Sequence, residues 1–231
     1  MPEFRALIES SFLDWDDKVC AVVYVPRCNL RCPFCHNWMM LEHPEELPPV
    51  PEERIIALLE EHGDFLDGLC ITGGEPVLYP DLAEFIERVR GKGALVKLDT
   101  NGTVPEALDA LLSSRSIDYV AMDIKAPLDE RYEKAVGCKV DLEKVKESIS
   151  LIMDKAPDYE FRTTVVPAIL AKDDVVSIAK EISGARRYVL QQYVPENAWM
   201  PEMRLVKPYP RETVMEMAEI AKNYANEVVV R

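Results

Sequence analysis

Apolar, β-branched segments alternate with amphipathic helical segments along most of this 231-residue chain. The apolar segments predict six strands, at 20–25, 68–72, 94–98, 119–122, 160–165 and 187–192. Helix start signals fall between them, such as Pro51 before 52–61 and Pro80 before 81–90. Strict alternation of this kind requires parallel pairing with right-handed crossovers. We therefore expect an α/β fold, either an open sheet or a barrel, with too few units for a closed eight-unit barrel.

The segments outside this alternation predict how the domain ends. Residues 4–12 and 227–230 are expected as extra edge strands, although the first could equally be an irregular arm. The proline-rich stretch 42–51 joins one loop to the next helix and does not separate two domains. We therefore expect a single domain over residues 1–231, with its core at about 12–192 and a C-terminal helix and strand in 193–231.

Composition excludes several classes of protein. The net charge of −14 would repel a phosphate backbone, which argues against nucleic acid as a partner. The apolar runs are far shorter than the roughly 20 residues that cross a bilayer, and no signal-peptide pattern opens the chain. Six cysteines are too few and too unevenly spaced for a secreted disulfide framework. We expect a cytoplasmic protein without a membrane partner.

Polar residues gather where the expected strands end. They occupy 28–37, 73–75, 99–102, 123–125 and 191–192. The carboxyl ends of parallel strands share one edge of the sheet, and ligands bind there because loops can vary without disturbing the core. The sequence therefore predicts one continuous site.

The segment CNLRCPFC places Cys28, Cys32 and Cys35 close enough to converge on one metal centre. A cubane iron–sulfur cluster normally takes four thiolates, so three would leave one iron open to another ligand. The alternative is zinc held by the three cysteines with His36 or His43. The remaining cysteines, expected as buried or isolated thiols, are Cys20, Cys70 and Cys138.

Charged residues at the strand ends form a second group. Gly73 and Gly74 would let a ligand approach the backbone, and Glu75 could accept hydrogen bonds from an amino group; a plain strand-ending turn is the alternative. Asp99 and Asp123 should meet over the site, which requires a cation or a shared proton.

Two basic residues are candidate partners for these carboxylates. Lys125 is a candidate counter-charge, and Arg162 is costly to bury unpaired, so we expect it to face an anion. A solvated cluster of ion pairs is the alternative for the whole group.

The motifs together resemble a known family. CNLRCPFCHN at 28–37, followed by Gly-Gly-Glu-Pro at 73–76, is similar to the radical S-adenosylmethionine superfamily. KLDTNG at 97–102, DYVAMDIKAP at 118–127 and FRTTVVP at 161–167 resemble activating enzymes of glycyl radical enzymes. Among these, the compact activators of anaerobic ribonucleotide reductase are the most similar. The resemblance spans about 12–192 and implies a partial barrel of six βα units.

The resemblance also implies a cofactor and the residues that hold it. Cys28, Cys32 and Cys35 would bind a [4Fe-4S] cluster whose fourth iron takes the amino and carboxylate groups of S-adenosylmethionine. The remaining roles implied by the resemblance are these: the methionyl amino group at Gly73, Gly74 and Glu75; the adenine near Phe34; the carboxylate region at Lys125 and Arg162; and a monovalent cation at Asp99, Thr100 and Asp123, as in the pyruvate formate-lyase activator.

Two positions depart from the family pattern. Arg27 stands where the family often has glycine, and Val194 stands where the pyruvate formate-lyase activator has a histidine that touches the nucleoside. Gln191 or Gln192, at the end of the last expected strand, is the candidate replacement.

The resemblance predicts an enzyme that cleaves S-adenosylmethionine reductively to a 5′-deoxyadenosyl radical. The radical would abstract hydrogen from a glycine of a partner such as anaerobic ribonucleotide reductase, with flavodoxin or ferredoxin as a low-potential electron donor. One alternative is a radical enzyme with a small-molecule substrate, for example a deazapurine synthase. Another is a non-catalytic zinc or electron-transfer protein.

Overall fold

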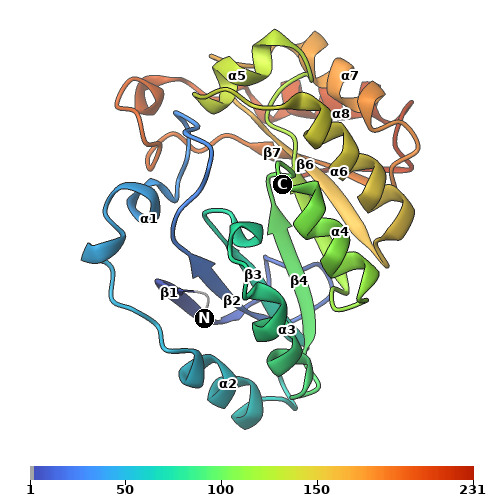
Figure 1. The fold of residues 1–231 in the computed structure, drawn as a ribbon. Helices are drawn as coiled ribbons and strands as arrows, with labels where there is room; N and C mark the ends of the chain where they lie inside the picture. Colours follow the sequence, from blue (N-terminus) through green and yellow to red (C-terminus); the bar gives the residue numbers. More distant parts are fainter. Residues whose placement is uncertain (1–2) are drawn as a thin grey trace.

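The computed structural model describes residues 3–231, so Met1 and Pro2 of the expected domain lie outside the described residues. One eight-stranded sheet has its strands in chain order, from β1 to β8 (Figure 1). β1 pairs antiparallel with β2, and every later pair is parallel. The strands are β1 (Ala6–Ser11), β2 (Cys20–Val25), β3 (Gly68–Gly73), β4 (Leu95–Thr100), β5 (Tyr119–Asp123), β6 (Tyr159–Val165), β7 (Arg187–Gln192) and β8 (Glu227–Val230).

The six central strands and both edge strands confirm the expected elements, with ends that shift by two residues or fewer at the six central strands. The α-helices are α1 (Trp38–Glu42), α2 (Glu52–Glu61), α3 (Leu82–Arg90), α4 (Pro105–Ser113), α5 (Glu130–Val136), α6 (Leu142–Lys155), α7 (Lys172–Glu181) and α8 (Arg211–Ala221). α5 was not expected from the sequence. No helix in residues 3–231 is long and apolar enough to cross a bilayer.

The two faces of the sheet have different interiors. The outward-facing strand residues pack with the apolar faces of the helices in one large core, as Ile71 and Phe85 do. The inward-facing residues at the amino ends of the strands form a smaller cluster, which includes Cys20, Cys70 and Tyr119. The sheet is curved around this inner cluster as a partial barrel, which confirms the expected class of fold.

The loop between β1 and β2 joins the two edges of the sheet. Trp15, which is 6% exposed, packs in the inner cluster with its ring centroid 5.8 Å from that of Tyr119. Asp16 Oδ2 accepts hydrogen bonds from Arg187 Nη1 at 3.0 Å and from Arg231 Nη2 at 2.6 Å. We call residues 12–18 the barrel floor, because they cover the inner cluster where β5 and β7 begin.

Candidate active site

The three motif cysteines lie in the loop that follows β2. Cys32 is buried, while Cys28 and Cys35 are half-buried, and all three line one cavity of about 410 Å³. The loop is held by one bond within it and one to the end of α5, since Cys35 N donates to Cys32 O at 3.0 Å and Arg31 N donates to Val136 O at 2.8 Å. The structure therefore brings the three thiols to the same cavity, as the sequence predicted.

The spacing of the thiols fits a cluster better than a single zinc ion. The sulfur atoms of Cys28, Cys32 and Cys35 are not all within 4.8 Å of one another. Among the described residues, only His43, Glu45 and Glu46 form a group of three possible ligands that close together. Thiolates on one tetrahedral zinc would be about 3.8 Å apart, given Zn–S distances of about 2.3 Å. A cubane spaces its thiolates more widely because each binds a different iron.

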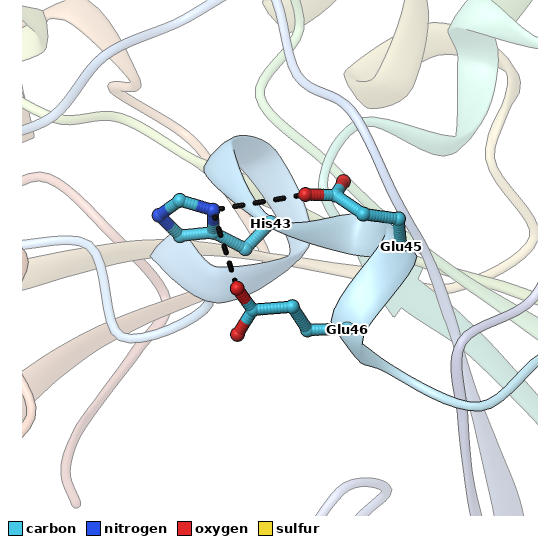
Figure 2. A group of neighbouring side chains, drawn as sticks. All are labelled: His43, Glu45 and Glu46. Atoms are coloured by element: carbon cyan, nitrogen blue, oxygen red, sulfur yellow. Dashed lines mark ion pairs between the residues drawn. The ribbon is translucent and has the colours of Figure 1, made fainter.

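Both histidines considered as a fourth zinc ligand already have other partners. His36 Nε2 is hydrogen-bonded to Val194 O at 2.7 Å. His43 Nδ1 lies 3.8 Å from a carboxylate oxygen of Glu45 and 3.8 Å from one of Glu46, as Figure 2 shows. The side chains of this group are 45–71% exposed, so it is a surface ion-pair group and carries no site.

Burial keeps the three thiols protonated until a metal binds. Burial raises the pKa of Cys28 to about 11 and that of Cys32 to about 12, and it also raises the pKa of Cys35. The free thiols are therefore protonated near neutral pH, and binding iron displaces these protons. Near them, Cys138 Sγ reaches Asn29 O at 3.5 Å but does not line the cavity.

Hydrogen bonds from its own loop and from the loop after β4 reach the first cysteine. Leu30 N donates to Cys28 Sγ at 3.4 Å, and Asn101 Nδ2 donates to the same sulfur at 3.6 Å. Asn101 also donates to Asn29 Oδ1 at 3.0 Å and accepts from Thr103 Oγ1 at 2.6 Å. Asn101 was not predicted as a site residue, although it lies within the KLDTNG motif.

The glycines after β3 are required by the backbone of the cysteine loop. A Cβ on Gly74 would lie 1.7 Å from Arg27 O, and Gly73 has φ +118° with Val25 backbone atoms 2.5 Å from the same position. Gly74 N donates to Val25 O at 2.7 Å, and Asn37 Nδ2 donates to Gly73 O at 2.9 Å. Close packing of two loops therefore explains these glycines without a ligand, although both line the cavity.

Glu75 is 1% exposed and lines the same cavity. Its carboxylate accepts from Thr100 Oγ1 at 2.7 Å, from Asn101 N at 2.7 Å and from Val77 N at 3.4 Å. Burial raises its pKa to about 7, against the lowering effect of these hydrogen bonds. Glu75 is thus a carboxylate that can change its charge near neutral pH.

Five charged side chains form a row across the strand ends. Arg162 Nε donates to Asp123 Oδ1 at 2.8 Å and Nη1 to Asp99 Oδ2 at 3.0 Å. Lys125 Nζ donates to Asp123 Oδ2 at 2.8 Å, and Lys97 Nζ donates to Asp99 Oδ1 at 2.7 Å. We call Lys97, Asp99, Arg162, Asp123 and Lys125 the charge row. The structure thus pairs both expected carboxylates with both expected bases.

All five members of the charge row are ionised. Burial opposes ionisation of Asp99 and Asp123. Arg162 outweighs it together with a lysine, Lys97 at Asp99 and Lys125 at Asp123, and the pKa of each carboxyl lies below its usual value. Burial likewise opposes protonation of Lys97 and Lys125, yet their aspartate partners raise the pKa of each ammonium. Lys97 was missed at the sequence level.

The rim of the cavity is built by the cysteine loop and the segment after β7. Phe34, expected near an adenine, is 6% exposed and lines the cavity. Met200 N donates to Pro33 O at 2.9 Å, which ties the two segments together. Gln191 lines the cavity, whereas Gln192 Nε2 donates to Tyr209 O at 2.9 Å and does not line it.

Further residues line the cavity that sequence analysis did not single out. Asp14 carried no signal, because the segment around it mixes apolar and charged residues without a period. The others of this set include Tyr24, Thr72 and Thr164, which face inward from β2, β3 and β6. The strands that carry them were predicted, but the sequence prediction did not assign which strand residues point into the cavity.

Comparisons with known proteins give the class of this chain. A family model described as the Radical SAM superfamily matches residues 22–182. The chain therefore belongs to the radical S-adenosylmethionine superfamily, which implies a [4Fe-4S] cluster and S-adenosylmethionine and an enzyme rather than a non-catalytic zinc protein.

Two relatives resemble the chain along nearly all of its length. Both are proteins of Methanocaldococcus jannaschii named as a putative glycyl-radical enzyme activating enzyme. One is 36% identical over 97% of this chain and 94% of its own length; the other is 27% identical over 97% and 85%. A 7-carboxy-7-deazaguanine synthase of Methanopyrus kandleri is 32% identical over only 46% of this chain and 49% of its own length.

Solved structures share the fold. A domain of a pyruvate-formate lyase-activating enzyme from Bacteroides vulgatus has a TM-score of 0.58 and 17% identity, over 71% of this chain and 98% of that one. Streptococcus suis SuiB bound to precursor peptide SuiA has a TM-score of 0.68 and 14% identity, over 90% of this chain and 48% of that one.

Proposed function

We propose that this enzyme installs a glycyl radical on a partner protein. The observation that carries the proposal is the relative named as an activating enzyme, which matches this chain at 36% identity from end to end. The partner would be a glycyl radical enzyme such as anaerobic ribonucleotide reductase. The electron would come from a low-potential donor such as flavodoxin or ferredoxin.

Within this proposal, Cys28, Cys32 and Cys35 hold the [4Fe-4S] cluster. When bound, the cluster supplies one electron to the sulfonium of S-adenosylmethionine, which releases methionine and a 5′-deoxyadenosyl radical that takes the hydrogen of a glycine Cα–H bond. The thiols converge on the cavity from one short loop, and their spacing exceeds that of a zinc site.

The charges that line the cavity suit the zwitterionic end of S-adenosylmethionine. Its ammonium would lie near the Gly73–Gly74 backbone and Glu75, and its carboxylate would face Lys125 and Arg162. Charge-assisted hydrogen bonds of this kind are among the strongest that a protein makes.

The nucleoside end of the cofactor would then meet the rim of the cavity. Phe34 and Gln191 line the cavity near the segment after β7, so they are the proposed contacts of the adenosine. Gly as substrate is favoured on steric grounds, because a residue without a side chain lets its backbone approach the adenosyl carbon closely.

The test uses anaerobically reconstituted enzyme, S-adenosylmethionine, a chemical or flavodoxin reductant and a glycyl radical enzyme encoded beside this gene. We expect 5′-deoxyadenosine and the α-hydrogen doublet of a glycyl radical by electron paramagnetic resonance. The Cys32→Ala variant should bind no intact cluster and give neither product, while Cys138→Ala should retain roughly four irons and full activity.

One other function has specific support. The partial match to a 7-carboxy-7-deazaguanine synthase favours a small-molecule substrate, although it covers only 46% of this chain. Cleavage of S-adenosylmethionine without a glycyl radical, together with turnover of a purine analogue, would establish that function instead.

A further inference from the structure

The family resemblance implies a monovalent cation bound by Asp99, Thr100 and Asp123, and the structure of these residues does not fit one. A hard cation needs several oxygen ligands aimed at one point. The Thr100 hydroxyl donates to Glu75 Oε1 at 2.7 Å, and its oxygen already accepts from Gly102 N at 3.2 Å. Each of the four carboxylate oxygens of Asp99 and Asp123 already accepts from a cationic side chain.

The charge of the row also opposes a further cation. Three cationic side chains face two carboxylates, so the charge row carries a net charge of about +1 before any ligand binds. A metal cation would add a second uncompensated positive charge in a site shielded from water, which costs free energy. An incoming carboxylate, by contrast, would neutralise the row.

Lys97 differs from the other two bases of the row in what it can reach. It is 1% exposed, on the inner face of β4, and it does not line the cavity. Its Nζ contacts Asp99 Oδ1, lies 3.9 Å from Cys70 Sγ, and lies 5.9 Å from the Tyr119 ring centroid. Its ammonium therefore does not face the ligand cavity, and Asp99 is the carboxylate with which it pairs.

We propose that the Lys97 ammonium is the built-in cation of this site. From its buried position outside the cavity it neutralises Asp99, so that Arg162 is held between Asp99 and Asp123 with no bound metal ion. Lys97 is thus a positioning residue that replaces the cation of related sites. The inference concerns the cofactor site of the proposed function and rests on that function only for its second measurement.

The first measurement is the thermal unfolding of the apoprotein in tetramethylammonium, sodium and potassium chloride at equal ionic strength. The Tm of the wild type should be the same in all three salts. Lys97→Ala removes the ammonium and opens space beside Asp99, so its Tm should be lower. In potassium or sodium chloride the Tm of Lys97→Ala should be about 2–4 °C higher than in tetramethylammonium chloride, because the small cation binds the folded state alone.

Two control variants separate this role from simple packing. Lys97→Met fills the same space without charge, so its Tm should fall and no cation should rescue it. Lys92→Ala removes a surface lysine that pairs with Glu60, and its Tm should not depend on the cation. Equal behaviour of Lys97→Ala and Lys97→Met in every salt would overturn the proposal.

The second measurement needs no variant and so does not depend on whether one folds. Reconstituted wild-type enzyme should bind S-adenosylmethionine with the same affinity, within about twofold, in tetramethylammonium and in potassium or sodium salts. A loss of tenfold or more without a metal cation would overturn the proposal. Failure to bind S-adenosylmethionine in any salt would instead contradict the proposed function, and the Tm comparison would still decide the role of Lys97.

Discussion

The side-chain amide of Asn101 donates a hydrogen bond to the sulfur of Cys28, with Nδ2 and Sγ 3.6 Å apart. Hydrogen bonds to cluster sulfurs stabilise the more negative, reduced state of an iron–sulfur cluster and raise its potential. Asn101 is 5% exposed, its backbone N–H donates to Glu75, and its Oδ1 also accepts from Thr103 N at 3.0 Å.

We predict that Asn101→Ala lowers the midpoint potential of the cluster by about 40 mV. This is the one-electron equivalent of a hydrogen bond worth about 1 kcal/mol. Thr103→Val is the matched control, because Thr103 bonds to Asn101 Oδ1 and not to sulfur. Spectroelectrochemical titration measures both potentials, and that of Thr103→Val should equal the wild-type value. An unchanged potential in Asn101→Ala would refute the role of Asn101.

Ionisation of the buried Glu75 carboxyl should lower the free energy of unfolding as pH rises. Burial raises its pKa from 4.5 to about 7 in the folded protein, so between these values the folded state binds more protons than the unfolded state. The free energy of unfolding therefore decreases as pH rises from about 4.5 to 7, and the penalty is complete above about 7. Glu75→Gln should raise the stability of the apoprotein at pH 8 by about 1–3 kcal/mol.

The gain from Glu75→Gln should disappear below about pH 4.5, where the carboxyl is protonated in both states. Urea unfolding at pH 8 and pH 4.5 measures the difference. The same variant should bind S-adenosylmethionine about tenfold to a hundredfold more weakly, if Glu75 receives its ammonium. The quantity compared is the free energy of unfolding of Glu75→Gln minus that of the wild type. A smaller difference at pH 8 than at pH 4.5 would contradict the assigned pKa.

Lys125→Ala should weaken S-adenosylmethionine binding by about tenfold to a hundredfold while the cluster remains. The change removes one of the two cations proposed to face the carboxylate, which is typically worth about 1.5–3 kcal/mol in an enclosed site. Equilibrium binding to the reconstituted, unreduced enzyme measures the effect. Lys144→Ala, which removes an exposed partner of Glu106, should bind as the wild type does, and equal affinities in the two variants would rule out the proposed role of Lys125.

The barrel floor should contribute to stability through Trp15. Trp15→Ala leaves a cavity in the inner cluster, so the free energy of unfolding should fall by about 3–5 kcal/mol. Leu13, two residues away in the floor, is 84% exposed, and Leu13→Ala should change stability by less than about 0.5 kcal/mol. Denaturant unfolding of the pair tests whether the floor is packed as described, and similar values for both variants would speak against it.

The sequence predicted those parts of the fold and site that depend on local pattern. Strands such as 187–192 were bounded correctly because their apolar runs are flanked by clear helix and turn signals. The position of the thiols at one edge followed from parallel topology alone. α5 was missed because its seven residues are too few to show a helical period.

The remaining features depend on partners far away in the chain. The floor mixes apolar and charged residues without a strand or helix period, and its role is visible only through its contacts with Tyr119, Arg187 and Arg231. Lys97 interrupts an apolar strand, and only the inward direction of its side chain shows that it is an ion-pair partner of Asp99. The glycines after β3 were assigned to ligand approach, whereas the structure shows that the backbone of the cysteine loop already requires them.

The bond between Asp16 and Arg231 joins residues 215 positions apart, which has a consequence for the order of folding. Closing so large a loop costs chain entropy, so we expect the floor to close after the strands between these residues have paired. The segment that meets the cysteine loop at Pro33 also follows β7, so we expect it to dock late as well. Pulsed hydrogen exchange during refolding would reveal this order, since amides of β4 and β5 should be protected before those of β8. Protection of β8 first would reverse it.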